Sequence, residues 1–167
     1  MDIVIDTREK PQELERIIPQ IRAEGVHVIK NKLYVGDYQS LDNARLVVDR
    51  KKDLNELCGN VCQQHERFKR ELLRAIESNI KIVILCEHGN GITCLEDVYF
   101  WENPRKHKVV WKTVNGRKVK TVLSEKAVDG IQLYRSLSTI HDRYNVDFVF
   151  CEKENTGHEV VRILSGE

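Results

Sequence analysis

The run Ile80–Cys86, with the sequence IKIVILC, limits the possible folds of this chain more than any other segment. Its nearly unbroken series of aliphatic residues is typical of a strand that is covered on both faces of a sheet. Helical patterns precede and follow it, and this alternation predicts an α/β domain with a central mixed sheet flanked by helices. Further strands are expected at Ile3–Ile5, Val26–Leu33, Tyr34–Ser40, Ala44–Arg50 and Val146–Cys151.

The helical segments follow from apolar residues that recur at intervals of three and four. Pro11 and Gly25 delimit the first helix, and Pro19 is expected to kink or divide it. Gly59-Asn60 is expected to break the second, longer pattern. The predicted helices are 11–25, 52–78, a short one ending near Asn103-Pro104, 124–144 and 156–164. Because we find no repeat, linker or low-complexity segment, residues 1–167 are expected to form a single domain.

A basic insertion is expected at about residues 104–123. The net charge of the chain is only +1, yet seven Lys or Arg residues and no acid lie between Pro104 and Ser124. Asn115-Gly116 separates two strand-like runs there and is a strong signal for a β-hairpin. Such a patch, with Trp111 inside it, suits contact with nucleic acid, whereas a solvated arm is the alternative. The candidate DNA-binding residues of this segment are Arg105, Lys106, Lys108, Lys112, Arg117, Lys118 and Lys120.

The N-terminal sequence lacks the pattern of a signal peptide, and no run of about 18 apolar residues is present. Five cysteines without framework spacing fit a reducing compartment, so we expect a cytoplasmic protein that does not enter a membrane. Cys58, Cys62 and His65 have a spacing that a zinc site can use. Since no fourth ligand is evident, small core thiols are the preferred interpretation.

Asp37, Asp49 and Lys51 are the candidate catalytic residues. If a turn at Leu41–Asn43 joins two strands, paired residues have numbers that sum to about 84–86, so Asp37 lies opposite residues 47 to 49. Asp49 and Lys51 are two residues apart and therefore share one face of their strand. Side chains opposite each other across strands are about 5 Å apart, so these three groups converge. A surface salt bridge on a hairpin is the alternative.

Two carboxylates beside an ammonium group suit the hydrolysis of a phosphodiester. A hard divalent cation such as Mg²⁺ or Mn²⁺ takes oxygen ligands from one or two acids, and water and phosphate complete its shell. The cation neutralises the phosphate and activates water, while a lysine orients the water and stabilises developing negative charge. The pattern thus suits a metal-dependent nuclease, but by itself it does not separate a nuclease from the surface salt bridge.

Four ordered motifs resemble the nuclease domain of the XPF/Mus family of structure-specific endonucleases. They are Asp6-Thr-Arg-Glu9, Val35-Gly-Asp-Tyr38, Val47-Val-Asp-Arg-Lys51, and the helix of Arg67 that precedes the strand Ile82–Glu87. The closing segment Tyr144–Phe150 with Thr156-Gly157 is similar as well, so the resemblance extends from Asp2 to about Leu164. The resemblance implies a metal-dependent nuclease of the PD-(D/E)xK superfamily with a restriction-endonuclease-like core.

The resemblance also implies roles for individual residues. Asp37 and Asp49 correspond to the metal-binding acids, and Lys51 corresponds to the catalytic lysine. Glu9 matches a further acid near the metal, and Asp6 matches an outer ligand or an orienting group. Arg8, Arg50 and Arg67 match residues that support the site or meet the DNA backbone, although ion pairs with Asp6, Asp53 or Glu71 would explain them equally.

Some features depart from the family pattern. Asp49 stands where the family usually has Glu, and either Asp53-Leu54 or Glu56-Leu57 fills the step after the lysine. No helix-hairpin-helix module or helicase domain is recognised, which is reminiscent of stand-alone bacterial or phage-encoded relatives.

The implied function is a Mg²⁺- or Mn²⁺-dependent endodeoxyribonuclease that acts on branched or flapped DNA in repair, recombination or replication. A homodimer is a candidate assembly, because a small domain must hold a large duplex. A Holliday-junction resolvase and a catalytically inert DNA-binding partner of a nuclease are the alternative functions.

Overall fold

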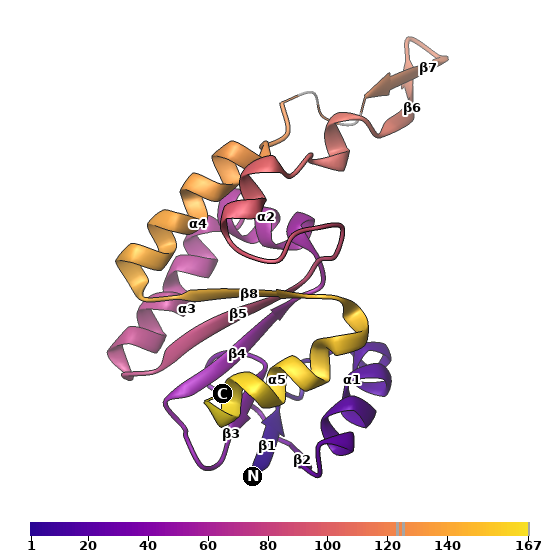
Figure 1. The fold of residues 1–167 in the computed structure, drawn as a ribbon. Coiled ribbons are helices and arrows are strands. Elements are labelled where there is room, and N and C mark those ends of the chain that lie inside the picture. Colours follow the sequence, from indigo (N-terminus) through magenta and orange to yellow (C-terminus); the bar gives the residue numbers. More distant parts are fainter. Residues whose placement is uncertain (123, 125, 167) are drawn as a thin grey trace.

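A six-stranded mixed sheet forms the centre of the protein (Figure 1). The computed structural model describes residues 1–122, 124 and 126–166. The strand order is β2-β1-β3-β4-β5-β8, in which β3 is antiparallel to both β1 and β4, and the other neighbours are parallel. The strands are β1 (Asp2–Ile5), β2 (His27–Lys30), β3 (Tyr38–Ser40), β4 (Leu46–Lys51), β5 (Lys81–Glu87) and β8 (Asp147–Cys151).

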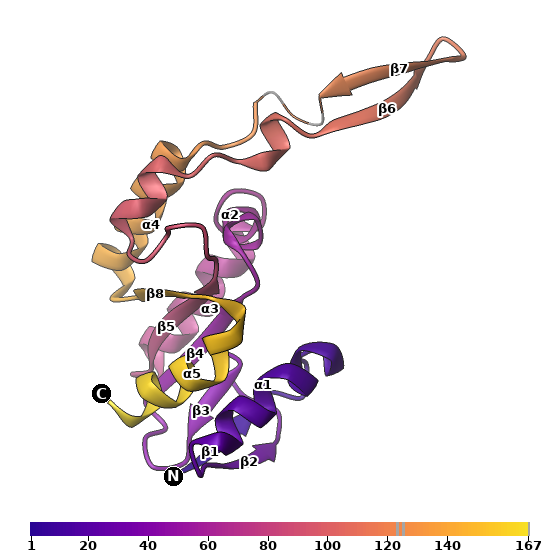
Figure 2. The ribbon, with the colours of Figure 1, turned by 45° about the vertical axis from the view of Figure 1, so that its right-hand side comes forward.

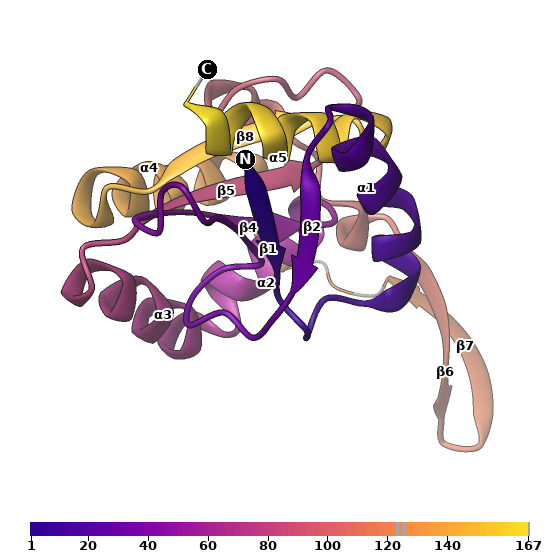
Figure 3. The same ribbon diagram turned by 90° about the horizontal axis from the view of Figure 1, so that it is seen from below.

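Helices cover both faces of this sheet, and each face buries its own apolar core. On one face, α1 (Pro11–Ala23) and α5 (Thr156–Ser165) pack on residues such as Ile5, Val48 and Leu85. On the other, α2 (Leu54–Cys62), α3 (His65–Glu77) and α4 (Gly130–Tyr144) pack on Val47 and Ile84. Figure 3 shows α3 and α5 on opposite sides of β4 and β5. The predicted α/β fold with a mixed sheet is confirmed.

The central strands β4 and β5 follow directly from their residue pattern. Nearly every residue of β5 is buried, as its unbroken apolar sequence predicts for a strand covered on both faces. In β4, alternate side chains enter the two cores, since Val47 faces α2 and α3 whereas Val48 faces α1 and α5. The same alternation continues into the polar residues at the end of β4 and therefore sorts them onto two faces.

Several sequence-based boundaries were wrong. Helix α1 runs through Pro19 without division. The break between α2 and α3 lies at residues 63–64 rather than at Gly59-Asn60, because the Gly59 carbonyl accepts the last bonds of α2. Helix α4 begins at Gly130 rather than Ser124, since Asp129 provides a capping box there. A 3-10 turn at Glu96–Phe100 takes the place of the short helix that was expected to end near Asn103-Pro104, and further 3-10 turns occur at Pro104–Lys106 and Lys153–Asn155. Strands β2 and β3 are shorter than the predicted strands.

The expected basic hairpin is present as a separate two-stranded sheet formed by β6 (Val109–Val114) and β7 (Arg117–Val122). Asn115 and Gly116 have φ angles of 48° and 74°, the left-handed values that a tight hairpin turn requires. Leu123 and Glu125, which the predicted insertion and following helix included, lie outside the described residues. Figures 1 and 2 show the hairpin projecting from the body, at the end opposite to both termini. No helix in the described ranges is long and apolar enough to cross a membrane.

Candidate active site

Asp37 is fixed at the point where three strands meet. Its amide donates to the carbonyl of Val48 on β4 (2.9 Å), and its carbonyl accepts from the amide of Asp6 after β1 (2.8 Å). Gly36 precedes it at a φ of 73°, and a side chain there would press against Val47. One carboxylate oxygen of Asp37 accepts the amide N–H of Arg50 at 2.8 Å. The position of this carboxylate is therefore set by backbone on both sides.

Asp49 and Lys51 extend from β4 on the face that packs against α2 and α3. The Nζ atom of Lys51 lies 2.8 and 2.7 Å from the two carboxylate oxygens of Asp49. Both residues are buried, and Nζ also lies 6.0 Å from the centre of the Phe68 ring. Lys51 is thus held in a short, desolvated contact with an acid, unlike an exposed lysine on a hairpin surface.

The strand register brings Asp37 to this pair. Tyr38 is paired with Val48 and Gln39 with Val47, so paired numbers sum to 86. The predicted range of 84–86 is confirmed for this pairing. Asp37 directly precedes β3, and its amide donates to the carbonyl of Val48, the neighbour of Asp49 on β4. Asp37, Asp49 and Lys51 therefore lie at the same end of the sheet, where they line one cavity.

A cavity of about 660 Å³ opens over these three side chains. Its wall is strongly polar and comes from the ends of β3 and β4, the start of α1, and one side each of α2 and α3. Besides Asp37, Asp49 and Lys51, it is lined by Arg8, Glu9, Lys10, Glu13, Gly36, Arg50, Lys52, Asp53, Asn55, Glu56, Gly59, Asn60, Gln64, Arg67, Phe68 and Glu71. A cavity with convergent polar groups is the usual setting of a catalytic site.

The electrostatics of the cavity are dominated by the two aspartates. Burial raises the pKa of Asp37 well above its ordinary value, and the nearby charges of Asp49 and Glu9 raise it further, against the opposing effect of Lys51. Burial acts to lower the pKa of Lys51, but the carboxylates of Asp49 and Asp37 outweigh it and raise that pKa. Lys51 therefore keeps its positive charge, and the two carboxylates favour the approach of a further cation.

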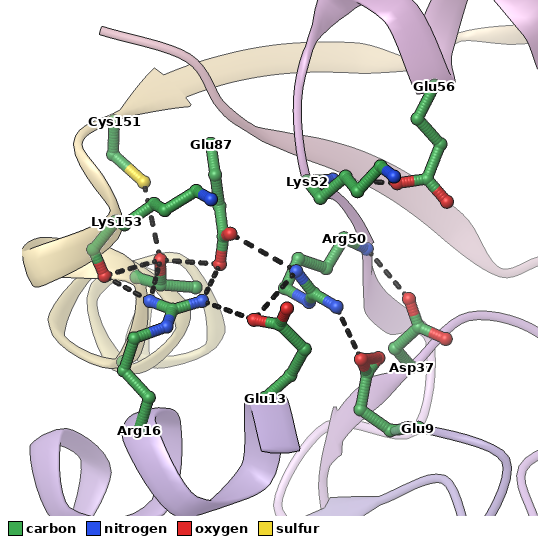
Figure 4. A network of polar contacts seen from close by, with 12 residues as sticks. Glu9, Glu13, Arg16, Asp37, Arg50, Lys52, Glu56, Glu87, Cys151 and Lys153 are labelled. Carbon is green, nitrogen blue, oxygen red and sulfur yellow. Dashed lines mark hydrogen bonds and ion pairs between the residues drawn. The ribbon is translucent and has the colours of Figure 1, made fainter. Parts of the chain in front are cut away.

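The side chain of Arg50 extends from the opposite face of β4, although the residue also contributes to the wall of the cavity. Its guanidinium forms ion pairs with Glu9 and with Glu87 at 3.2 Å, and a longer one with Glu13 at 3.6 Å (Figure 4). Its side chain is 7% exposed, and that of Glu87 is fully buried. Although burial acts to lower the pKa of Arg50, the glutamates raise it. The structure thus gives Arg50 a structural ion pair, with partners other than the expected Asp53.

Sequence reasoning assigned no role to Glu13 or Glu87. Glu87 accepts bonds from Arg16 on α1 and from the hydroxyl of Thr156 at 2.8 Å, so the network of Figure 4 joins β5, α1 and α5. One signal was present, since Glu87 ends the central strand at the same edge of the sheet as Lys51, which pairs with Cys86. An acid at the end of a buried strand needs a cation or donors nearby.

The ERCC4 domain family matches residues 5–162 of this sequence. The chain belongs to the ERCC4 domain family. The resemblance inferred from the four motifs, to an XPF-type nuclease domain, is therefore confirmed. No curated protein matches the chain.

Two solved structures share the fold of this ERCC4 domain. XPF from Aeropyrum pernix superposes with a TM-score of 0.62 at 17% sequence identity, covering 98% of this chain and 63% of that one. The structure of XPF from Aeropyrum pernix in complex with DNA gives a TM-score of 0.61 at 15% identity, with the same coverages. The ERCC4 domain chain thus spans less than two thirds of each of these proteins.

Other predicted site residues of the ERCC4 domain are placed differently. Both oxygens of buried Asp6 accept hydrogen bonds, from Arg8 and from the amide of Leu33, which lower the pKa of Asp6 to about 2 despite its burial. Asp6 therefore orients Arg8 and does not line the cavity, so a metal role for it stays a prediction that this arrangement does not support. Glu9 lines the cavity but is paired with Arg50, and Arg67 lines it without an ion pair to any described residue.

The zinc alternative finds no support in the described part of the ERCC4 domain, where no group of three or more His, Cys, Asp or Glu side chains is arranged to hold a metal. Cys58 is a buried core thiol as preferred from the sequence, and burial raises its pKa to about 12. Cys62, by contrast, is exposed. A metal in the cavity would therefore rely on two protein carboxylates, with its other ligands from outside the chain.

Proposed function

We propose that this ERCC4 domain is a metal-dependent endonuclease that hydrolyses phosphodiester bonds in DNA. The observation that carries the proposal is the convergence of Asp37, Asp49 and Lys51 in one polar cavity. Family membership supports it, and so does the shared fold with an XPF whose structure contains DNA.

The donor set of the cavity fits a hard divalent cation, Mg²⁺ or Mn²⁺. Mg²⁺ is commonly held by one or two carboxylates and completes its octahedron with waters and substrate phosphates. Asp37 and Asp49 are the two carboxylates, and the pKa of Asp37 is raised by burial and then by the negative charges of Asp49 and Glu9, effects that a bound cation would oppose. When bound, such an ion supplies positive charge to the phosphate and makes water a better nucleophile.

The protein's own residues perform the remaining work. The backbone contacts of Asp37 hold its carboxylate in place before substrate arrives. The charged ammonium group of Lys51 orients water and stabilises negative charge that develops on the phosphate oxygens. Burial of Lys51 beside Phe68 strengthens that interaction because little water screens it. Arg67 and Lys52, at the cavity wall, contact the flanking phosphates.

Branched or flapped DNA is the substrate class that we propose, from the similarity to structure-specific endonucleases. The test is to incubate wild type and Asp37→Ala with end-labelled flap, fork, four-way junction and linear duplex DNA, in EDTA and with Mg²⁺ or Mn²⁺. Asp42→Ala is the matched control, since Asp42 lies on the same hairpin and is exposed.

We expect metal-dependent cutting of the flap and fork by wild type and by Asp42→Ala, and none by Asp37→Ala. Equal cutting of linear duplex would contradict the substrate class alone. Absence of cutting of every substrate would contradict the enzymatic proposal and favour an inert DNA-binding partner.

A further inference from the structure

The charges of this chain are divided between the body and the segment Pro104–Val122, which we call the basic arm. The arm holds seven of the 27 Lys and Arg residues and no Asp or Glu. The rest of the chain, which we call the body, contains the other 20 Lys and Arg residues and all 26 Asp and Glu residues. The body therefore carries a formal net charge of −6, and the arm carries +7. A body of that net charge repels a polyanion at long range, so the arm is the main source of long-range attraction.

The strand register sorts the side chains of the arm onto two faces. Trp111 is paired with Lys120, and Thr113 is paired with Lys118. Because paired side chains in an antiparallel ladder share a face, Trp111 lies on the same face as both lysines, within about 5–8 Å. The other face holds Lys112 opposite Val119. One aromatic ring between ammonium groups is an arrangement suited to a phosphate backbone and its bases.

The arm contacts the described part of the body near its base, at Asp129, and its hairpin projects away from there. It forms its own two-stranded sheet and projects beyond α2, a helix that lines the cavity (Figures 1 and 2). Trp111 is 68% exposed, whereas Trp101 in the body is 7% exposed. Of the seven cations, only Lys106 pairs with an acid among the described residues, with Asp129 at 3.7 Å. A two-stranded hairpin on its own is marginally stable at best, and exposed apolar side chains among polar ones are typical of an interaction site.

We propose that the basic arm grips duplex DNA beside the cavity, chiefly through Trp111, Lys118 and Lys120. This inference rests on the proposal that DNA is the substrate. A two-stranded ribbon fits the major groove of B-DNA, and each six-residue strand of the arm spans about 20 Å. The arm thereby supplies the affinity that the acidic body lacks, while the cavity supplies the chemistry.

The test measures binding in EDTA, so that cleavage does not contribute. A labelled duplex is titrated by fluorescence anisotropy at two salt concentrations with wild type and with Lys112→Gln/Lys118→Gln/Lys120→Gln. The matched control is Arg22→Gln/Arg45→Gln/Arg143→Gln, which removes the same charge from exposed arginines of the body. Thermal unfolding of each variant verifies that it is folded.

We expect the arm variant to bind at least about tenfold more weakly, and its slope of log affinity against log salt to fall by about 2 to 3. The affinity of the control variant for the duplex is expected to stay within about threefold of that of wild type. Because the protein has two tryptophans and Trp101 is buried, a change in tryptophan emission on adding duplex is expected to vanish in Trp111→Phe.

Equal loss of duplex affinity in the arm variant and in the control would overturn the proposal. A change in tryptophan emission that persists in Trp111→Phe would also overturn it. Tighter binding of single strands or of an acidic polypeptide than of duplex would overturn the choice of partner. Duplex binding through the arm without any metal-dependent cutting would instead contradict only the proposed enzymatic function.

Discussion

Replacement of Asp37 by Asn is expected to stabilise the metal-free protein. Asp37 and Asp49 line the same cavity, and side chains that neighbour each other across strands are about 5 Å apart. Two unit charges at that distance repel by about 3 kcal/mol at an effective dielectric constant of about 20. The positive charge of Lys51 offsets part of this repulsion. We therefore expect the free energy of unfolding of Asp37→Asn to exceed that of wild type by about 1–2 kcal/mol, which corresponds to a rise in Tm of roughly 2–8 °C.

The pH dependence follows from the raised pKa of Asp37. The folded chain binds this proton more tightly than the unfolded chain, whose carboxyl has the ordinary pKa of 3.8. The stabilisation by the proton is fully present below that pH and is lost as the pH rises through the pKa of the folded state. The free energy of unfolding of wild type is therefore expected to fall progressively below that of Asp37→Asn as the pH increases.

The assay is urea unfolding in EDTA at about pH 5 and about pH 8, with Asp42→Asn as the control. Addition of Mn²⁺ is expected to stabilise wild type and Asp42→Asn, and to stabilise Asp37→Asn much less, because ligand that binds only the folded state raises its stability. An Asp37→Asn protein that is less stable than wild type in EDTA, or that gains equally from Mn²⁺, would refute the reasoning.

Two further variants test the buried ion pairs. Arg50→Met leaves buried Glu9 without its cation and Glu87 with Arg16 alone, so urea unfolding is expected to show a loss of about 3–5 kcal/mol in the free energy of unfolding. A loss below about 1 kcal/mol would contradict the network. Asp6→Asn removes a carboxylate whose pKa is lowered to about 2 by Arg8 and the Leu33 amide. A lowered carboxyl pKa stabilises the folded protein at pH values above the ordinary pKa of that group. We therefore expect the free energy of unfolding of Asp6→Asn to be about 2 kcal/mol below that of wild type at neutral pH, and this difference to disappear between about pH 4 and pH 2. A difference that does not depend on pH would contradict the stabilising role of the Asp6 charge.

Much of the site was predictable because it depends on local geometry. A short turn between two strands fixes their register, which brings Asp37 near Asp49, and the period of two places Asp49 and Lys51 on one face. The unbroken apolar run of β5 predicted its central place, and Asn115-Gly116 predicted the hairpin. In each case the deciding contacts lie within a few residues in the sequence or follow from one strand pairing.

The partners of Arg50 were not predictable, because they depend on packing between distant segments. Glu9 and Glu87 lie 41 and 37 residues away along the chain and meet Arg50 only when α1 and β5 are docked. The failure to foresee the break after Cys62 has a related origin, since a glycine within a helix is tolerated when tertiary contacts hold the flanking turns. The distribution of charge along the chain was visible, but its separation into an arm and a body required the fold.

The most direct test of the central claim is the single-turnover cleavage rate of a flap substrate in Mn²⁺ with Asp49→Asn. Asp49 holds Lys51 and lines the cavity together with Asp37, so we expect the rate to fall by at least about 10²-fold, the scale of losing one preorganised catalytic group. Asp42→Asn is expected to cut at the rate of wild type. Cleavage by the Asp49→Asn variant at the wild-type rate would contradict the assignment of this cavity as the active site.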